Sequence, residues 1–543
     1  MKKIALFLIC CLSFFYYFCF WRLPATKPTN IKPLEPTTTA ALVPLDSRPV
    51  CTRLPQQIAH LAGTNLRLPP ASILDQYRKP AAQAPLLAWL TVQSQQYPAS
   101  IYAAADMLLS GGLIASRKQS QNPQERQALL QQLKALSAKQ KQTSWYYFSL
   151  IPRLLVSNEL IPDCWYQFHL QKYSQLYHIA QELNDYPATT ELQYYTEKIP
   201  AEILTKYKSL YQENFNFNCQ LLTLTDNATI VIGQDDGSPW GLPSLSYQQL
   251  EAITAKNKQV HMTYGADEIA SMLIARDYLS RKSLRPRIAL HYAHPSIPSL
   301  YMPYQATNVD NVLQEKINFL NAEITDNEDK ADLILYVNCG HDSYRPSKNE
   351  AQQLQELLQA KKPVALIDLS ANFEENELLM PLLLQNNVPI MQLTAYAGWN
   401  TFSNSAGTVL PEALIFLARQ NESNNTQRLA LHKERADLLC RHFLDDYAYQ
   451  KQFHARLKTK LLGLNIEPTD LQPKEKAYAQ ALANSFVRSR ARELLHQNLG
   501  QMPFYQDDNH AYYLTQLDVK TTFPWSRIFE VQLEITTKVG QTP

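Results

Sequence analysis

Short apolar segments with the pattern of buried strands recur along this chain of 543 residues, and a stretch with the pattern of a helix separates most of them from the next. We count nine such strands between residues 39 and 394, among them residues 144–151, 287–292 and 389–394. Parallel strands need a crossover connection, usually a helix, so this alternation predicts parallel sheet. Near the C-terminus, residues 529–535 alternate between apolar and polar, and this period of two predicts a half-buried antiparallel strand paired with residues 512–519.

The predicted fold class is therefore α/β, built from parallel strand-helix units. We expect a (β/α)8-type barrel with helical additions and a C-terminal antiparallel hairpin. Two doubly wound domains that meet near Leu284 to Arg287 are the alternative, because nine strands exceed the eight of a barrel. The expected divisions of the chain beyond its first residues are an α/β core over 40–420, with a subdivision near 285, a helical region over 421–500, and a hairpin region over 501–543 packed on the core.

Residues 1–23 are predicted to be a membrane anchor or a signal segment. Lys2 and Lys3 precede an uninterrupted apolar run from Ile4 to Trp21, which is about the minimum length of a membrane span. Positive residues stay on the cytoplasmic side, so the remainder is expected outside the cytoplasm, anchored or secreted. A cleaved signal is the rival interpretation, although no small-x-small site follows the run. Residues 24–39, rich in Pro and Thr, are expected to form a tether.

Composition and motifs exclude several classes of function. The formal net charge is only +2, whereas a nucleic-acid-binding protein would show a basic stripe or a pI above about 9. The chain has no Walker loop, no Gly-x-Gly-x-x-Gly fingerprint and no Gly-x-Ser-x-Gly elbow. We therefore expect no nucleic-acid partner and no cofactor, and a small molecule or a glycan as the ligand.

Polar side chains follow the predicted strands, at the point where each strand ends. Because the carboxyl ends of parallel strands share one edge of a sheet, these side chains are expected to converge. One such residue would mean little, since Asp and Asn are ordinary turn formers. The recurrence carries the prediction, and the residues in chain order are Asp46, Asp106, Arg153, Asp235, Asp267, His291 or His294, Asn338 or His341, Asp368 and Asn400.

Two neighbouring strand ends carry paired carboxylates, and these are the candidate catalytic residues. One apolar run leads into Asp235 and Asp236, and the next leads into Asp267 and Glu268. Crowding of carboxylates raises the pKa of one of them, which a general acid requires near neutral pH. The alternative for Asp267 and Glu268 is structural, because they also begin a predicted helix, where the helix dipole favours acidic side chains.

Five segments resemble the signatures of one bacterial family, and in order they are Val43–Pro49, Gly111–Arg117, Gly233–Asp236, Tyr264–Glu268, and Gly398–Thr401 together with Asn404. The family is known as domain of unknown function number 4127, and the resemblance spans roughly residues 40–538. Ser47 stands where the family usually has a second Asp, which argues against a role that needs two carboxylates in that loop. Phe402 and Ser403 replace a smaller pair. The family name implies no activity, so function has to be inferred from the residues.

The first functional hypothesis is glycoside hydrolysis, in which two carboxylates flank a glycosidic bond. Adjacent Asp-Asp or Asp-Glu pairs at a strand end also resemble substrate-assisted hexosaminidases, which act on N-acetylated sugars. In these enzymes one carboxylate orients the acetamido group and the next protonates the leaving oxygen. Trp240 and Trp399 are expected to stack on a sugar face, while Asn400 and Asn404 hold hydroxyls.

A metal-dependent hydrolase, for example a deacetylase, is the second hypothesis. It would draw oxygen and nitrogen ligands from Asp46, Asp106, Asp235, His291 and His294. The chain has no compact ligand motif, so we assign no metal residue and interpret the two histidines as ordinary polar residues at a strand end.

The third hypothesis is a tethered binding protein that holds a sugar or a peptide without turning it over. Arg48, Arg117 and Arg153 would anchor an anionic ligand, unless they only pair with neighbouring aspartates. The candidate substrate-binding residues from all three hypotheses are Asp46, Arg48, Asp106, Arg117, Arg153, Trp240, Trp399, Asn400 and Asn404.

Overall fold

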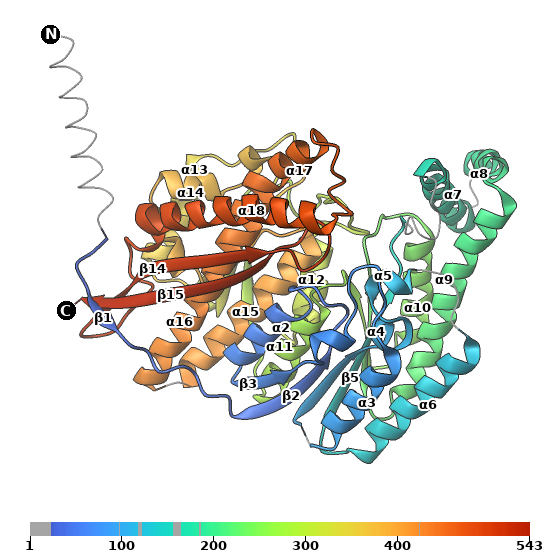
Figure 1. Cartoon of the computed structure of the whole chain (residues 1–543), viewed down its shortest axis with the longest axis horizontal. Coiled ribbons are helices and arrows are strands. Elements are labelled where there is room, and N and C mark those ends of the chain that lie inside the picture. The colour runs from blue at the N-terminus through green and yellow to red at the C-terminus, as the bar shows by residue number, and fades with distance from the viewer. Residues whose placement is uncertain are drawn as a thin grey trace, which may run out of the picture.

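The computed structural model of the chain describes residues 23–542, except 97, 118–121, 156–163, 184–185 and 423. The described strands form three sheets, two of them parallel and one antiparallel (Figure 1). The predicted anchor, residues 1–23, lies outside the described residues except for Leu23. The alternation of strands and helices, and hence the α/β class, is confirmed.

The first sheet is parallel throughout and contains six strands in the order β3-β2-β4-β5-β6-β7. Its strands are β2 (Thr38–Val43), β3 (Thr64–Arg67), β4 (Ser100–Ala104), β5 (Ser144–Ile151), β6 (Thr229–Gln234) and β7 (Val260–Tyr264). The central strands are apolar along nearly their whole length because helices cover both faces of such a sheet. The accompanying helices are α2 (Arg53–Leu61), α3 (Gln83–Ser94), α4 (Ala105–Ser110), α5 (Leu113–Ser116), α6 (Pro123–Lys139), α7 (Cys164–Leu183), α8 (Tyr186–Lys198), α9 (Ala201–Leu221), α10 (Leu242–Thr254) and α11 (Ile269–Arg281).

The second sheet is also parallel and contains five strands in the order β12-β11-β10-β8-β9. Its strands are β8 (Arg287–Tyr292), β9 (Glu323–Ile324), β10 (Leu333–Gly340), β11 (Val364–Ser370) and β12 (Ala395–Ala397). Its helices are α12 (Val309–Phe319), α13 (Lys348–Gln359), α14 (Met380–Gln385) and α15 (Phe402–Glu422). One predicted strand, residues 389–394, is wrong: Ile390–Gln392 is a 3-10 turn and the strand begins at Ala395. Pro389 offers no backbone N–H to a sheet, which explains the shift.

The two parallel sheets share one strand order. In each, the first strand of the sheet (β2 or β8) has the second on one side and the third on the other, as in doubly wound folds. A (β/α)8-type barrel is therefore not confirmed, and the division between β7 and β8 falls near the boundary that the alternative placed at Leu284 to Arg287. In doubly wound folds the order in which strands are added reverses between the first and third strands, and ligands bind there, outside the carboxyl ends of the strands.

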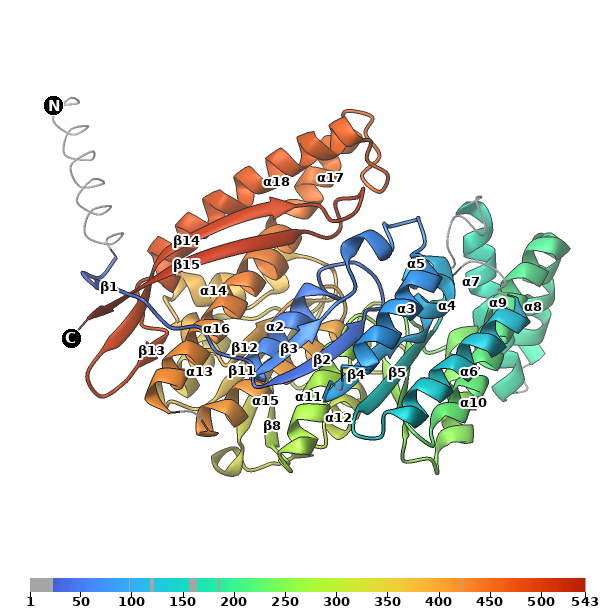
Figure 2. The ribbon, with the colours of Figure 1, turned by 60° about the horizontal axis from the view of Figure 1, so that its bottom comes forward.

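The third sheet is antiparallel and confirms the predicted C-terminal hairpin. Its order is β1 (Lys27–Thr29), β15 (Gln532–Thr542), β14 (Ala511–Thr522) and β13 (Tyr505–Gln506). The hairpin lies alongside α18 (Pro473–Leu494) in both views of the ribbon (Figures 1 and 2). Part of the predicted tether is thus ordered differently from expectation, because β1 pairs with β15 and Leu34 is buried.

The predicted helical region follows the second sheet. It consists of α16 (Asn425–His442), a π-helix over Phe443–Phe453, α17 (His454–Leu462) and α18. Helices α11 and α15 pack on each other, and one hydrophobic core runs through both parallel sheets. The two sheets are therefore held together by a shared core, which fixes how the loops at their carboxyl ends face each other.

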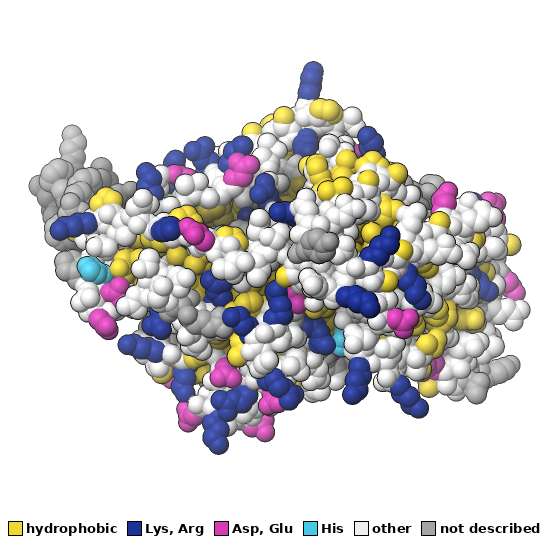
Figure 3. All heavy atoms as spheres, turned by 90° about the horizontal axis from the view of Figure 1, so that it is seen from below, with side chains coloured by type: hydrophobic (Ala, Val, Ile, Leu, Met, Phe, Trp, Pro, Cys, Tyr) yellow, Lys and Arg dark blue, Asp and Glu magenta, His cyan; other side chains and the backbone are white. Residues whose placement is uncertain are grey.

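The surface carries charges of both signs. On the face shown in Figure 3, Lys and Arg side chains are scattered among neutral and acidic ones, as is typical of a solvent-exposed surface. Within the described part of the chain, every helix is too short or too polar to cross a membrane.

Candidate functional site

A cavity of about 380 Å³ lies where the carboxyl ends of the first sheet meet loops of the second. From the first sheet come the segments after β2, β4, β5, β6 and β7. Loops after β8, β11 and β12, and the connection between β14 and β15, complete the wall. The polar lining residues are Arg48, Arg117, Arg153, Gln234, Asp235, Asp236, Asp267, Gln305, Asn400, Thr401, Ser403, Asn404 and Arg527.

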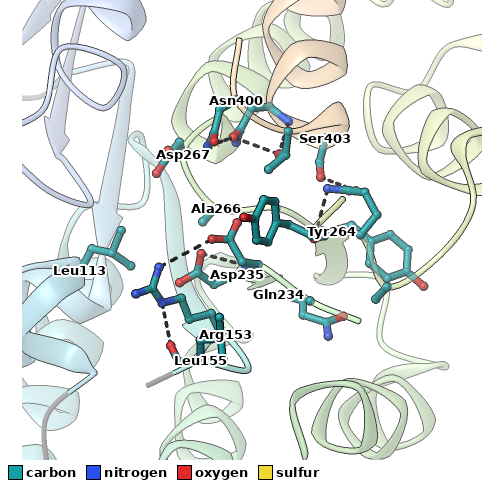
Figure 4. A pocket seen from close by; sticks show the side chains of 18 of the residues that line it. Leu113, Arg153, Leu155, Gln234, Asp235, Tyr264, Ala266, Asp267, Asn400 and Ser403 are labelled. Atoms are coloured by element: carbon teal, nitrogen blue, oxygen red, sulfur yellow. Dashed lines mark hydrogen bonds and ion pairs between the residues drawn. The ribbon is translucent and has the colours of Figure 1, made fainter. Parts of the chain in front are cut away.

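Asp235 and Asp236 enter the cavity directly after β6. The backbone N–H of Asp235 donates to the Ile151 carbonyl on β5 at 3.1 Å, so the parallel pairing continues past the strand end. The Asp235 carboxylate is buried and receives a hydrogen bond from the guanidinium of Arg117. Asp236 keeps about a third of its side chain exposed, and Arg153 Nη1 lies 3.8 Å from its Oδ2. Figure 4 shows Asp235 and Arg153 together at the cavity.

The environments of these two carboxyls move their pKa values in opposite directions. Burial raises the pKa of Asp235, but the Arg117 and Arg153 guanidiniums more than offset this and hold it below its ordinary value. Burial and the neighbouring Asp235 charge raise the pKa of Asp236 to about 6. Separated pKa values in adjacent carboxyls are the arrangement that lets one act as an acid while the other stays ionised.

Arg48 is the centre of a buried ion cluster at one end of the cavity. Its Nε lies 2.9 Å and its Nη2 2.7 Å from Asp46 Oδ2. Both terminal amines also donate to Asp267, with Nη1 to Oδ2 at 3.1 Å. Glu530 approaches from the β14–β15 connection, 3.7 Å from Nη1. Burial raises the pKa of Asp267 to about 7, even though Arg48 opposes the shift.

Glu268 is held away from the cavity by a second buried pair. Lys316 on α12 lies 3.0 Å from Glu268 Oε1, and Asn404 Nδ2 donates to Oε2 at 2.6 Å. Gly265 has a φ of +96°, and a side chain on it would collide with the Glu268 carboxylate. This pair joins the first sheet to α12 and α15, so Glu268 stabilises the arrangement of the two sheets and does not line the cavity.

Aromatic residues form an exposed rim around the polar floor. Tyr304 and Phe373 line the cavity, and each has about half of its side-chain surface exposed. Both adopt a left-handed backbone conformation, with φ of +63° and +61°, as does Asn400 with φ of +55°. Bulky residues rarely adopt positive φ, and such strain concentrates at functional sites. Phe529 completes the rim.

Several candidate residues lie outside the cavity. Asp46 is buried behind Arg48, and Asp106 accepts a hydrogen bond from the Leu150 backbone N–H at 3.0 Å on β5. Trp240 packs edge-on against His178, with ring centroids 5.1 Å apart. Trp399 lines a separate small cavity beside His442. The predicted stacking role of the two tryptophans is therefore wrong for this cavity, whose aromatic residues are Tyr264, Tyr304, Phe373 and Phe529.

The residues proposed as metal ligands do not assemble into one site. Asp235 is bound by Arg117, His291 lies 3.1 Å from Glu328, and His294 lies 2.7 Å from Ser296 Oγ. Asp46, Cys51 and Asp267 offer donor atoms within 4.8 Å of one another. The Arg48 guanidinium, however, already binds both of those carboxylates and lies 4.0 Å from the thiol. The cation that this cluster suits is the arginine side chain, so its residues do not fit a metal ion.

Sequence reasoning missed the cavity residues supplied by loops and by the hairpin. Tyr304, Phe373, Arg527 and Phe529 follow no motif that marks them as functional. Arg527 packs over Trp525, 4.7 Å from the ring centroid, and donates to Glu530, with Nε 2.8 Å from Oε2. For Arg527, the only signal in the sequence was that it lies in the turn between two predicted antiparallel strands. A turn alone does not show which part of the protein it packs against.

Asp75 was also missed, and from a later loop it supplies a second carboxyl beside Asp46 and Ser47. Ser47, which replaces the expected second Asp, donates its backbone N–H to Asp75 Oδ1 at 2.7 Å. The Ser47 hydroxyl accepts from Trp525 Nε1 at 2.9 Å. Burial and the Asp46 charge raise the pKa of Asp75 to about 8.

This shift predicts a pH-dependent contribution to stability. The folded protein holds the Asp75 proton more tightly than the unfolded chain, so stability should fall as pH rises from about 4 to about 8. We expect Asp75→Asn, which keeps the acceptor for Ser47, to gain thermal stability relative to the natural protein as pH increases. Thermal unfolding followed by circular dichroism at pH 5, 7 and 9 measures this. Asp332→Asn, at an exposed ion pair, is the control. If the unfolding temperature of Asp75→Asn varied with pH in the same way as that of the natural protein, the raised pKa of Asp75 would be contradicted.

The fold and the cavity together define a class of protein: an α/β protein in which two parallel sheets enclose a site of arginines, aspartates and exposed aromatics. The chain belongs to the family described as Protein of unknown function (DUF4127), whose model matches residues 40–534. The resemblance seen in the sequence is thereby confirmed. No curated protein and no solved structure gives a significant match to the chain.

Proposed function

We propose that this protein is a carbohydrate-active hydrolase, similar to a glycoside hydrolase, that acts through Asp235 and Asp236. The observation that carries the proposal is the pair itself: adjacent carboxyls reach one cavity, and one has a lowered pKa while that of the other is raised to about 6. Glycoside hydrolysis needs one ionised and one protonated carboxyl beside the scissile bond.

The proposed roles follow from exposure and charge. Asp236 is the general acid, because its partly exposed carboxyl can approach the leaving oxygen and donate its proton as the C–O bond breaks. Asp235, kept ionised by Arg117, stabilises the positive charge that develops on the sugar. With an N-acetylated sugar, Asp235 would orient the acetamido group, whose oxygen attacks the anomeric carbon. Water then completes the hydrolysis and returns a proton to Asp236.

Asp267 has a positioning role in this scheme. Both of its oxygens are bound by Arg48, so it lacks the freedom to approach a substrate as the acid. Glu268 is not assigned a catalytic role, because its carboxylate is bound by Lys316 and Asn404. Of the four predicted catalytic residues, the proposal keeps Asp235 and Asp236.

Sugar recognition is assigned to the rim. Tyr304 and Phe373 present exposed rings at the mouth of the cavity, and an aromatic face offers rigid, partly apolar contact area. Asn400 lines the floor, where its amide oxygen holds a sugar hydroxyl. The predicted role of Asn404 is not kept, because its amide is bound to Glu268, Asn400 and Thr401. We further propose that the globular part acts outside the cytoplasm, attached to the membrane or secreted through residues 1–23.

The pKa values predict the pH dependence of hydrolysis. Activity should decline as pH rises above about 6, because Asp236 then loses the proton that it donates. It should also decline at acid pH, where Asp235 becomes protonated. We expect a bell-shaped profile of kcat/KM, measured with a chromogenic glycoside, and loss of its alkaline limb in Asp236→Asn. A flat profile above pH 6 in the natural protein would assign the acid to another group.

The experiment that tests the proposal is a screen for release of reducing ends by the full-length protein from neutral, N-acetylated and acidic oligosaccharides. Turnover that persists in the presence of a chelator supports the proposal. Turnover that a chelator abolishes would favour the metal-dependent hydrolase. Binding of a saccharide without turnover would favour the tethered binding protein.

A further inference from the structure

The cavity lining contains more positive than negative side chains. Among the described residues, four arginines and three aspartates line it, namely Arg48, Arg117, Arg153 and Arg527 against Asp235, Asp236 and Asp267. The four arginines differ in whether a carboxylate binds them. Arg48 is bound to Asp46 and Asp267, Arg117 to Asp235, and Arg527 to Glu530, whereas Arg153 has no carboxylate within hydrogen-bond distance in the described part of the chain.

Arg153 is held in place by its Nε atom and leaves its terminal amines toward the cavity. Nε donates to the Leu155 carbonyl at 2.7 Å, a contact drawn in Figure 4. Asp236 Oδ2 lies 3.8 Å from Nη1, which is too long for a hydrogen bond. Tyr211 fixes the backbone beneath it by donating to the Arg153 carbonyl at 2.8 Å. Among the described residues, therefore, the two terminal amines of this fixed guanidinium have no hydrogen-bond partner.

Arg117 and Arg153 flank the adjacent carboxyls of Asp235 and Asp236: Arg117 donates to Asp235, and Arg153 Nη1 lies 3.8 Å from Asp236 Oδ2. The Arg117 charge, together with burial, lowers the pKa of Arg153 to about 10. The Asp235 and Asp236 carboxylates oppose this shift but do not cancel it, so the two guanidiniums are only partly neutralised. An ionised ligand group at this position would relieve the repulsion and accept the free hydrogen bonds of Arg153.

We propose that the sugar that binds this cavity is acidic, and that its carboxylate binds the terminal amines of Arg153 beside Arg117. The inference rests on the proposed carbohydrate function and names the class of its substrate. Among the described residues, Arg153 is the one lining arginine without a hydrogen-bonded carboxylate, and a single carboxylate on the sugar would fill that place. The flat, fixed guanidinium also matches the two oxygens of a carboxylate.

The test is equilibrium binding, which does not require turnover. Isothermal titration calorimetry on the full-length protein would compare glucuronate with glucose, galacturonate with galactose, and N-acetylmuramate with N-acetylglucosamine, with inorganic phosphate as a separate titrant. We expect at least one acidic sugar to bind about ten-fold or more tightly than its neutral partner. Arg153→Met should remove that preference and leave the neutral sugar unchanged, and Arg153→Lys should restore only part of it. Arg285→Met, at an exposed ion pair with Glu323, is the matched control.

The outcomes separate this inference from the proposed function. If acidic sugars bind selectively but no glycoside is hydrolysed, the inference stands and the hydrolase proposal fails. If hydrolysis occurs with equal preference for neutral sugars, the hydrolase proposal stands and the inference is overturned. Equal affinity for every acidic and neutral pair, binding of phosphate alone, or a preference that survives Arg153→Met would each overturn it.

Discussion

Asp236→Asn is expected to lower the rate of glycoside hydrolysis by about 100- to 10,000-fold, the usual contribution of a general acid. The amide has nearly the same shape as the carboxyl but cannot donate the proton that the leaving oxygen requires. Since Asp236 is about one-third exposed and its ion pair with Arg153 is long, at 3.8 Å, the substitution should leave the fold intact. The measurement is kcat/KM on the best substrate from the oligosaccharide screen.

A graded series of leaving groups makes this prediction specific. Substrates with strongly acidic leaving groups, such as dinitrophenol, need little protonation, so the Asp236→Asn variant should hydrolyse them at closer to the natural rate. Asp329→Asn, at an exposed ion pair with Lys362 in the second sheet, should behave as the natural protein. A uniform loss of rate across all leaving groups would show that Asp236 acts in some way other than as the acid.

Lys316→Met is expected to lower the free energy of unfolding by about 3–5 kcal/mol, because it leaves the buried charge of Glu268 without its partner. Lys316 and Glu268 are both almost fully buried, with Nζ and Oε1 3.0 Å apart. Lys316 also donates to Thr263 Oγ1 at 2.8 Å and to the Tyr264 carbonyl at the end of β7. Equilibrium unfolding in urea measures the change.

The double variant Lys316→Met with Glu268→Gln should recover part of that loss, because Glu268 then carries no uncompensated charge. The recovery should be incomplete, because Glu315, 3.6 Å from Lys316 Nζ, also loses its partner. Lys362→Met is the control: it breaks the exposed pair with Asp329, and we expect a change of about 1 kcal/mol or less. Equal effects of Lys316→Met and Lys362→Met would show that Glu268 does not depend on the buried lysine.

Much of the secondary structure was predictable because parallel strands are buried on both faces. Ser144–Ile151 and Arg287–Tyr292 form strands with the predicted ends. The short edge strands β3 and β9 were missed, since their exposed residues give no continuous apolar run. Whether strands close into a barrel or form two sheets depends on which strands pair, and the same strand-helix unit serves both arrangements.

The candidate site was predictable mainly on the side of the first sheet, although Asn400 and Asn404, after β12 of the second, were also predicted. Asp235, Asp267 and Arg153 follow strands of the first sheet, so the sheet edge brings them together as expected. Tyr304 and Phe373 lie in loops of the second sheet, and Arg527 in the hairpin connection. Their approach depends on the packing of one sheet against the other, which leaves no local pattern. Trp240 and Trp399 were favoured for their residue type, but packing directs them elsewhere.

The central claim is that segments distant in sequence form one carbohydrate site around Asp235 and Asp236. A crystal structure of the natural protein with an uncleavable thio-linked disaccharide, chosen from the sugars that bind, tests it most directly. We predict that the sulfur at the scissile position lies within hydrogen-bond distance of the Asp236 carboxyl, with a sugar ring against Tyr304 or Phe373. A disaccharide bound outside the cavity, or inside it with Asp236 remote from the sulfur, would contradict the account.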